Sequence, residues 1–192
     1  MKSTNLIVIA GLFLFGCPKS EKKAEPPKAE KKAEVNKAAP ASKPAMKKIH
    51  GPYALQPKND SGIGGEVKLE AVEGGVKVSV SVKNAPPGKH GTHIHEKGDC
   101  SSPDGKSAGG HFNPKGVDHG MPEGAPHHLG DLGNIEIGED GTGSLEATMT
   151  GATLDGGELS FIGRALIFHE KVDDGGQPTG NAGARLGCAE LK

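Results

Sequence analysis

The chain has 192 residues, enough for one ordinary domain, and it contains 33% hydrophobic residues, 3% aromatic residues and no tryptophan. Its net charge of −1 conceals two opposite parts. Residues 18–48 hold ten lysines and four glutamates, whereas the part from residue 49 onward holds 12 Lys and Arg against 20 Asp and Glu. The acidic character of the larger part excludes a nucleic-acid partner on charge grounds.

Residues 1–16 are typical of an export signal that ends just before a lipid-modified cysteine. Lys2 supplies a positive start, and residues 6–15 form an apolar run that is too short for the roughly 20 residues of a membrane span. The sequence LFGC, residues 14–17, resembles a bacterial lipobox. It predicts an exported lipoprotein that is anchored to a membrane through Cys17 and faces the periplasm. An ordinary secreted protein without lipid is the alternative.

Residues 17–48 are predicted to comprise the lipidated cysteine and a disordered tether. The segment consists mostly of Lys, Ala, Glu and Pro, and it offers almost nothing to bury. Such a composition does not compensate the entropy of ordering, and the prolines at positions 26, 27, 40 and 44 oppose one long helix. The alternative is a basic arm that lies on anionic lipid headgroups or cell-wall polymers.

Residues 49–192 are predicted to form one all-β domain. Its strand signals are the segments GEVKLEAV, VKVSVSV, NIEI, SLEATMT, LSFIGRALIFHE and ARLGCAEL. The first two alternate with period two, turn signals such as EGG and LDGG separate the strands, and no stretch has a helical period. The pattern indicates short antiparallel strands in a sandwich or flattened barrel.

Two segments, residues 97–131 and 173–183, are rich in Gly, Pro and Asp and are expected to be loops. Long loops inside a compact domain are usually functional or disordered. The first loop holds four of the nine histidines, which favours a functional role.

The first group of histidines lies in predicted strands. His93 and His95 are separated by one residue in THIHE, so both can point to the same face of a strand and bind one ion. His169 ends the apolar run ALIFH in another strand. Three imidazoles of this kind suit copper or zinc. The alternative is that these are ordinary surface or structural histidines.

The second group lies in the long loop and the residue that ends it. His111, His119, His128 and Asp131 supply three imidazoles and a carboxylate, which match a tetrahedral zinc site. Zinc would fix the conformation of a loop that has no core of its own. A solvated histidine-rich loop is the alternative.

Three cysteines are present: Cys17, Cys100 and Cys188. If Cys17 carries lipid, two remain, and export to an oxidising compartment predicts that they form a disulfide. Two free thiols are the alternative.

Five motifs in order, HIHEKGDC, SAGGHFNP, HHLGDLGN, FHEKVDD and TGNAGARLGC, resemble the signatures of copper/zinc superoxide dismutase, in its bacterial periplasmic or lipoprotein form. The resemblance spans about residues 64–190. It implies an eight-stranded Greek-key β-barrel or sandwich with two long functional loops. It also implies a Cys100–Cys188 disulfide.

The resemblance implies an enzyme that disproportionates superoxide to O2 and H2O2, with copper and zinc as cofactors. Copper would be held by His93, His95, His111 and His169, and zinc by His111, His119, His128 and Asp131, so that His111 bridges the two metals. Asp173 would link ligands of the two sites. Arg185 would attract and orient the anionic substrate. The catalytic roles would belong to Arg185 and His111.

Two other functions are considered. The first is a non-catalytic lipoprotein that buffers copper or zinc. Some bacterial relatives lack a copper ligand or the channel arginine, whereas all seven presumed ligands and Arg185 are present here, which favours the enzyme. A mononuclear zinc hydrolase needs a positioned base, and no such carboxylate stands out. The loop 173–183 has no lysine to steer substrate, and Lys97, Lys106 and Lys171 are candidates to replace it. The sequence leaves open whether the protein is a monomer or a homodimer.

Overall fold

The computed structural model describes residues 48–124 and 126–192. The predicted export signal, Cys17 and almost all of the predicted tether lie outside these residues. Within the described part of the chain, no helix has the length and apolar character needed to cross a membrane.

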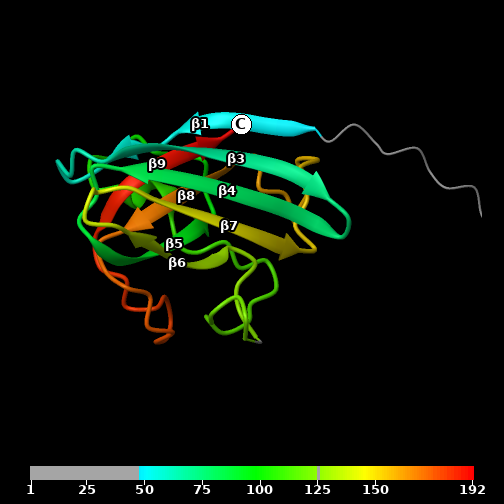
Figure 1. Cartoon of the computed structure of the whole chain (residues 1–192). Coiled ribbons are helices and arrows are strands. Elements are labelled where there is room, and N and C mark those ends of the chain that lie inside the picture. Colours follow the sequence, from blue (N-terminus) through cyan, green and yellow to red (C-terminus); the bar gives the residue numbers. More distant parts are fainter. Residues whose placement is uncertain (1–47, 125) are drawn as a thin grey trace, which may run out of the picture. The chain divides into compact units, whose positions relative to one another are not determined.

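The described chain forms two antiparallel sheets that pack face to face (Figure 1). The first sheet has the strand order β1 (Ile49–Ala54), β3 (Gly64–Val72), β4 (Gly75–Lys83) and β7 (Gly143–Thr150). The second has the order β2 (Gln56–Pro57), β9 (Arg185–Leu191), β8 (Arg164–His169), β5 (Gly88–His95) and β6 (Asp131–Ile137). The predicted all-β Greek-key sandwich is confirmed.

The first strand of the sandwich belongs to both sheets. β1 pairs with β3, and β2 pairs with β9. Only Leu55 separates β1 from β2, and its side chain is buried in the core. Counted as one strand that passes between the sheets, β1 and β2 bring the total among the described residues to the eight that were predicted.

The core lies between the sheets and follows the period-two pattern of the sequence. Alternate side chains of β4 are at most 3% exposed, namely Val76, Val78, Val80 and Val82. The second sheet contributes fully buried side chains that include Ile94, Leu166 and Phe168. Burial of each such side chain contributes about 1.5–3 kcal/mol, so this layer supplies the rigid support for the site.

The sequence analysis placed the start of one strand wrongly and missed two strands. The predicted strand LSFIGRALIFHE begins only at Arg164, because the chain turns before it: the Arg164 amide donates to the Phe161 carbonyl at 3.2 Å, and Gly163 has φ 86°. Phe161 is fully buried from within this turn, which explains its apolar, strand-like appearance. Strands β1 and β2 were not predicted, because they contain Pro52 and Pro57 and most of their side chains are exposed.

Apart from Asp131, which begins β6, the described residues of the two expected loops contain no strand, and their only helix is a 3₁₀ turn at Lys106–Ala108. Side-chain bonds connect the two loops. The His119 amide donates to Gln177 Oε1 at 3.1 Å, and Gln177 Nε2 donates to the His119 carbonyl at 2.8 Å. The loops are therefore held together beside the second sheet.

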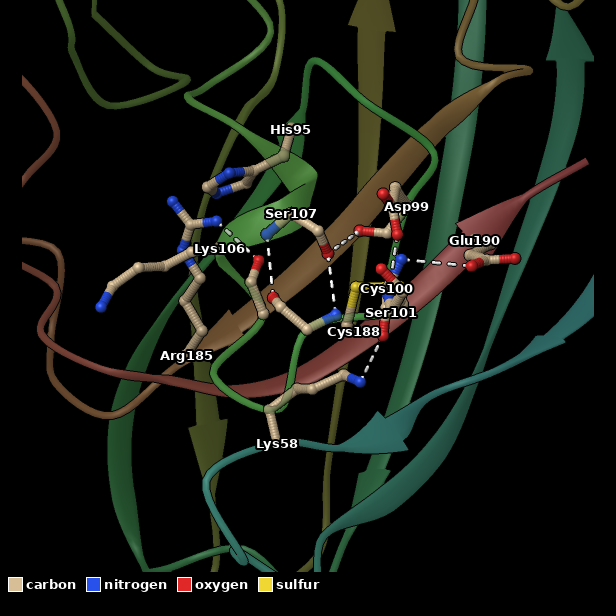
Figure 2. Close-up of a disulfide and its surroundings, with 12 residues drawn as sticks. Lys58, His95, Asp99, Cys100, Ser101, Lys106, Ser107, Arg185, Cys188 and Glu190 are labelled. Carbon is tan, nitrogen blue, oxygen red and sulfur yellow. Dashed lines mark hydrogen bonds between the residues drawn. A yellow bond between two sulfur atoms is a disulfide. The ribbon is translucent and has the colours of Figure 1, made fainter.

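The start of the first loop is fastened to the outer face of the second sheet (Figure 2). Cys100 and Cys188 form the predicted disulfide, with Cα atoms 5.8 Å apart. Around it lies a small buried cluster with Ala108, Ala165 and Ile167. The disulfide thus joins the loop to β9, the strand that begins with Arg185.

Candidate metal centre

Four buried histidines converge beside strands β5 and β8. His93 and His95 project from β5, His169 ends β8, and His111 lies opposite His95 in an isolated bridge. Each offers a ring nitrogen, and these nitrogens all lie within 4.8 Å of one another. The period-two spacing of His93 and His95 places both on one face, and the pairing of β5 with β8 brings His169 to them.

A second buried cluster adjoins the first. His111, His119, His128 and Asp131 also present candidate ligand atoms within 4.8 Å of one another. Asp131 begins β6, and it is fixed from two sides, because its Oδ2 accepts bonds from the amides of His128 at 2.8 Å and Gly120 at 3.2 Å. The carboxylate therefore holds the loop in place around the three imidazoles.

His111 belongs to both clusters. Its Nδ1 lies 2.9 Å from Asp131 Oδ1, which assigns this nitrogen to the second cluster. Its ring centroid lies 4.0 Å from that of His93 in the first cluster. Since an imidazole has two ring nitrogens, the other nitrogen is left for the first cluster.

Asp173 connects the two clusters through hydrogen bonds. His93 Nε2 donates to Asp173 Oδ2 at 2.8 Å, and His119 Nε2 donates to Asp173 Oδ1 at 2.9 Å. Asn134 holds the backbone of Asp173 at both its amide and its carbonyl, at 2.8 and 2.9 Å. This role of Asn134 was not predicted, although the residue stands in the quoted motif HHLGDLGN.

Four buried ring nitrogens in this centre have no hydrogen-bond partner: His93 Nδ1, His95 Nε2, His119 Nδ1 and His169 Nε2. In His93, His95 and His119 the other nitrogen donates to Asp173 or to the Gly109 carbonyl. Each orphaned nitrogen there is consequently the lone-pair nitrogen of the neutral ring. A buried polar atom without a partner costs about 1–3 kcal/mol. One ion in the first cluster would satisfy the nitrogens of His93, His95 and His169, and one ion in the second would satisfy His119 Nδ1.

The second cluster provides a further test of metal fit. His119 Nδ1, which carries the lone pair of the ring, lies 3.0 Å from Asp131 Oδ2, although both atoms are acceptors. Two acceptors this close repel unless a cation lies between them. Three imidazoles and a carboxylate are the donor set that zinc accepts in tetrahedral sites, so the residues present fit this ion.

The electrostatics of the first cluster favour the neutral form of three of its imidazoles. Burial lowers the pKa of His93 to about 4, against the opposing effect of the Asp173 hydrogen bond. Burial, followed by neighbouring rings such as His111, lowers the pKa values of His95 and His169 well below their ordinary value. Burial raises the pKa of Asp131, but bonds from His111 and the His128 amide outweigh it and the net shift is downward. Neutral rings and an ionised carboxylate are the protonation states that bind metals.

A cavity of about 370 Å³ opens onto the first cluster. Its lining includes His95, His111, His169 and, on the rim, Arg185. Arg185 Nη1 donates to the Gly105 carbonyl and Nη2 to the Gly109 carbonyl, both at 2.7 Å. Two bonds from a planar guanidinium fix its orientation, and its remaining donors are available to an anion.

The other histidines lie outside both clusters. His90 is buried, stacks on Phe168 and lies within hydrogen-bonding distance of the carbonyls of His169 and Pro86, at 3.0 and 2.9 Å. His127 contacts the His128 carbonyl through Nδ1 at 2.8 Å. His50 lies in β1. His90 therefore supports the backbone of a cluster residue, a role that the sequence did not reveal.

Comparisons with known proteins give one consistent family. A sequence model described as "Copper/zinc superoxide dismutase (SODC)" matches residues 63–191. The "Extracellular superoxide dismutase [Cu-Zn]" of Caenorhabditis elegans is 44% identical over 123 residues, which cover 60% of this chain and 55% of that protein. The protein of the same name from Drosophila melanogaster is 43% identical over 124 residues, which cover 60% and 67%. The chain thus spans about half to two thirds of the length of these relatives.

Solved structures resemble the described domain closely. The clock protein EA4 has a TM-score of 0.66 and 35% identity, covering 76% of this chain and 94% of that one. A SOD-like protein from Bacillus subtilis has a TM-score of 0.65 and 36% identity, covering 74% and 99%. Both match almost their whole length, which agrees with a single domain built around the two sheets.

Proposed function

This chain belongs to the copper/zinc superoxide dismutase family, and from that premise we propose that it disproportionates superoxide to O2 and H2O2. The overall reaction takes two superoxide anions and two protons to one O2 and one H2O2. The observation that carries the proposal is the pair of adjoining buried clusters that share His111, beside a cavity with Arg185 on its rim.

The proposed ligands follow the two clusters. The copper ligands are His93, His95, His111 and His169, and the zinc ligands are His111, His119, His128 and Asp131. Copper when bound supplies a one-electron redox couple, and zinc supplies a fixed positive charge without redox chemistry. The orphaned ring nitrogens and the acceptor pair of His119 and Asp131 support this assignment.

Arg185 brings the substrate to the site and orients it. Residues 49–192 carry an excess of acidic residues, which repel an anion, so positive charge at the cavity has to outweigh that repulsion locally. The guanidinium keeps its charge at every physiological pH and is held by the Gly105 and Gly109 carbonyls. Focusing of this kind can raise association rates by about 10–10³, and the copper/zinc superoxide dismutases are a known example.

His111 supplies one of the two protons. Its Nδ1 stays on the Asp131 side, and Nε2 is the atom that takes up a proton and donates it to the peroxide product. Asp173 keeps His93 and His119 in the tautomers that turn their lone pairs inward. The ring of His111 thereby remains oriented while its protonation state changes.

The test is a superoxide dismutation assay on the full chain reconstituted with copper and zinc, with bound metal counted. We expect both metals at one equivalent each and a rate that depends on copper. A fully metallated protein without dismutase activity would overturn the proposed enzymatic function and leave metal buffering as the alternative.

We also propose that the protein is an exported lipoprotein that is anchored to a membrane and faces the periplasm. It would then meet superoxide outside the cytoplasm. The relatives from nematode and fly are named extracellular, which supports export. The apolar run, the LFGC sequence and the lysine-rich segment 18–48 support a lipid anchor at Cys17 and a tether that leads to the domain at residues 49–192. A disulfide in the domain agrees with an oxidising compartment.

A further inference from the structure

Lys58 has an unusual environment for a lysine. It follows β2 and is the one buried lysine of the described residues, with 8% of its surface exposed. Its Nζ donates to the carbonyl of Cys100, next to the disulfide (Figure 2). None of the ion pairs formed within residues 48–124 and 126–192 includes it. A buried ammonium without a carboxylate is costly, so its position calls for an explanation.

The turn that carries Lys58 connects the first loop to the start of β9. The Lys58 amide donates to the Leu186 carbonyl at 2.8 Å, and the Asn59 amide donates to the Pro103 carbonyl at 2.9 Å. Asn59 Nδ2 also donates to the carbonyl of Arg185 at 3.0 Å. This turn therefore bonds both to the segment that receives the Arg185 side chain and to the backbone of Arg185 itself.

Segment 99–109, the part of the loop between Asp99 and Gly109, behaves as one bonded unit. Ser102 and Ser107 exchange amide-to-hydroxyl bonds at 3.1 and 2.9 Å, and Ser107 Oγ donates to the Asp99 carbonyl at 2.9 Å. A Cβ placed on Gly105 would lie 3.3 Å from Cβ of Arg185 and 3.5 Å from Cγ of Lys58, so both stems pack against this glycine. A displacement at Cys100 is consequently passed on to the carbonyls that hold Arg185.

We propose that Lys58 is a positioning residue for Arg185. By holding the Cys100 carbonyl, it fixes segment 99–109, and the Gly105 and Gly109 carbonyls of that segment fix the guanidinium at the cavity. The proposal rests on the proposed function only for the role of Arg185 toward the substrate. The order of the Arg185 side chain is a separate and directly measurable consequence.

The first experiment observes Arg185 by nuclear magnetic resonance, in protein loaded with zinc and with copper kept in its reduced, diamagnetic state. The chain has two arginines, Arg164 and Arg185, so the Nε–H spectrum contains one signal to test and one internal reference. We expect Lys58→Met, which keeps most of the stem and removes the donor, to shift and broaden the Arg185 signal. The Arg164 signal should not change. Lys58→Arg, which keeps a donor and the charge, should restore the Arg185 signal.

The matched control is Lys68→Met, which removes the same charge from an exposed lysine of β3 that pairs with Glu66. It should leave both arginine signals unchanged. Equal changes at Arg164 and Arg185 in Lys58→Met, or no change at either, would overturn the proposal. If Lys58→Met does not fold, Lys58→Leu, which also removes the donor, is measured in its place by the same criteria.

The second experiment is a double-mutant comparison of kcat/KM and of azide affinity in the fully metallated protein. Lys58→Met should reduce both by about three- to thirtyfold in the native background, the range typical of indirect coupling. In the Arg185→Ala background it should have no further effect, because the residue through which it acts is gone. Equal losses in the two backgrounds would mean that Lys58 does not act through Arg185 and would overturn the proposal. An inactive but metallated protein would refute the proposed function and leave the arginine signals as the test of this inference.

Discussion

His111 is the residue on which the proposed chemistry depends most, because it contributes to both clusters. Every other candidate ligand belongs to only one of the two clusters, as His95 belongs to the first. Loss of His111 would remove a ligand from each cluster and the proton donor as well. Loss of a ligand that belongs only to the second cluster would leave all four candidate ligands of the first cluster in place.

We therefore expect His111→Ala and His119→Ala to differ in kind. His111→Ala should lower dismutation by at least about 100-fold, the lower end of the range for a positioned proton donor, and weaken binding of both metals. His119→Ala should release zinc and retain copper. The check is metal content by mass spectrometry together with activity for each variant. Retention of both metals by His111→Ala would contradict the shared role.

Arg185 should affect the rate without affecting metal binding. Arg185→Ala should keep both metals and lower kcat/KM by about tenfold or more at low ionic strength. The deficit should shrink as salt is added, because the Debye length falls to about 10 Å at 0.1 M and screens the attraction that only the native protein has. Stopped-flow rates over a salt series provide the measurement. Lys89→Ala, at the exposed start of β5, is the charge control and should leave the rate unchanged.

At the scale of elements, the sheets provide rigidity, whereas the loops depend on cross-links. β5 and β8 place three of the histidines through regular pairing, with His93 opposite Ile167 and His95 opposite Ala165. The first loop contributes Phe112 and Leu129 to the main core, and its remaining buried apolar residues form the small cluster around the disulfide. Its shape depends on the Cys100–Cys188 bond, the Gln177 bonds to His119 and the Asp131 bonds at its far end.

The disulfide should matter to stability and to Arg185 together. It closes a sequence separation of 88 residues, for which loop-closure entropy predicts about 4–5 kcal/mol as a ceiling. Cys188→Ser should lower the free energy of unfolding by up to that amount and raise the KM for superoxide. Urea unfolding of the metallated variant measures the first effect. A variant as stable as the native protein would show that the loop is held by its other contacts.

At the scale of the whole molecule, charge separates the chain into a basic part and an acidic part. Residues 18–48 carry a net +6 and residues 49–192 a net −8. The acidic domain disfavours an anionic substrate except where local positive charge exceeds it. Lys106, which lines a neighbouring surface cavity with Arg185, is ion-paired with Asp104 at 2.9 Å, so much of its charge is neutralised there. Among the described residues, Arg185 is the only lysine or arginine that lines the cavity at the first cluster.

Cys17→Ser should release the protein from the membrane. In a Gram-negative host, the native protein should incorporate labelled fatty acid and fractionate with membranes, whereas the variant should incorporate none. The domain is built from other residues, so dismutase activity per bound copper should be equal in the two proteins. Absence of label in the native protein would leave an ordinary secreted protein as the correct interpretation.

The sequence by itself determined the fold class and the identity of the residues that meet at the centre. Alternation of apolar residues is a local property of each strand, so β3, β4 and β7 could be predicted from their letters alone, and the spacing of His93 and His95 already placed both on one face. The motifs then indicated the family. Their order along the chain is visible without any structure.

Only the tertiary structure decided which atoms are free and which are held. The lone pair of His93 turns inward because Asp173, 80 residues away, accepts its other nitrogen. The start of β8 was misjudged because Phe161 is buried from a turn, a consequence of packing between sheets. Lys58 reaches Cys100 across 42 residues and Arg185 reaches Gly105 across 80. Such contacts depend on how the sheets and loops pack, and no local pattern of residues encodes that packing.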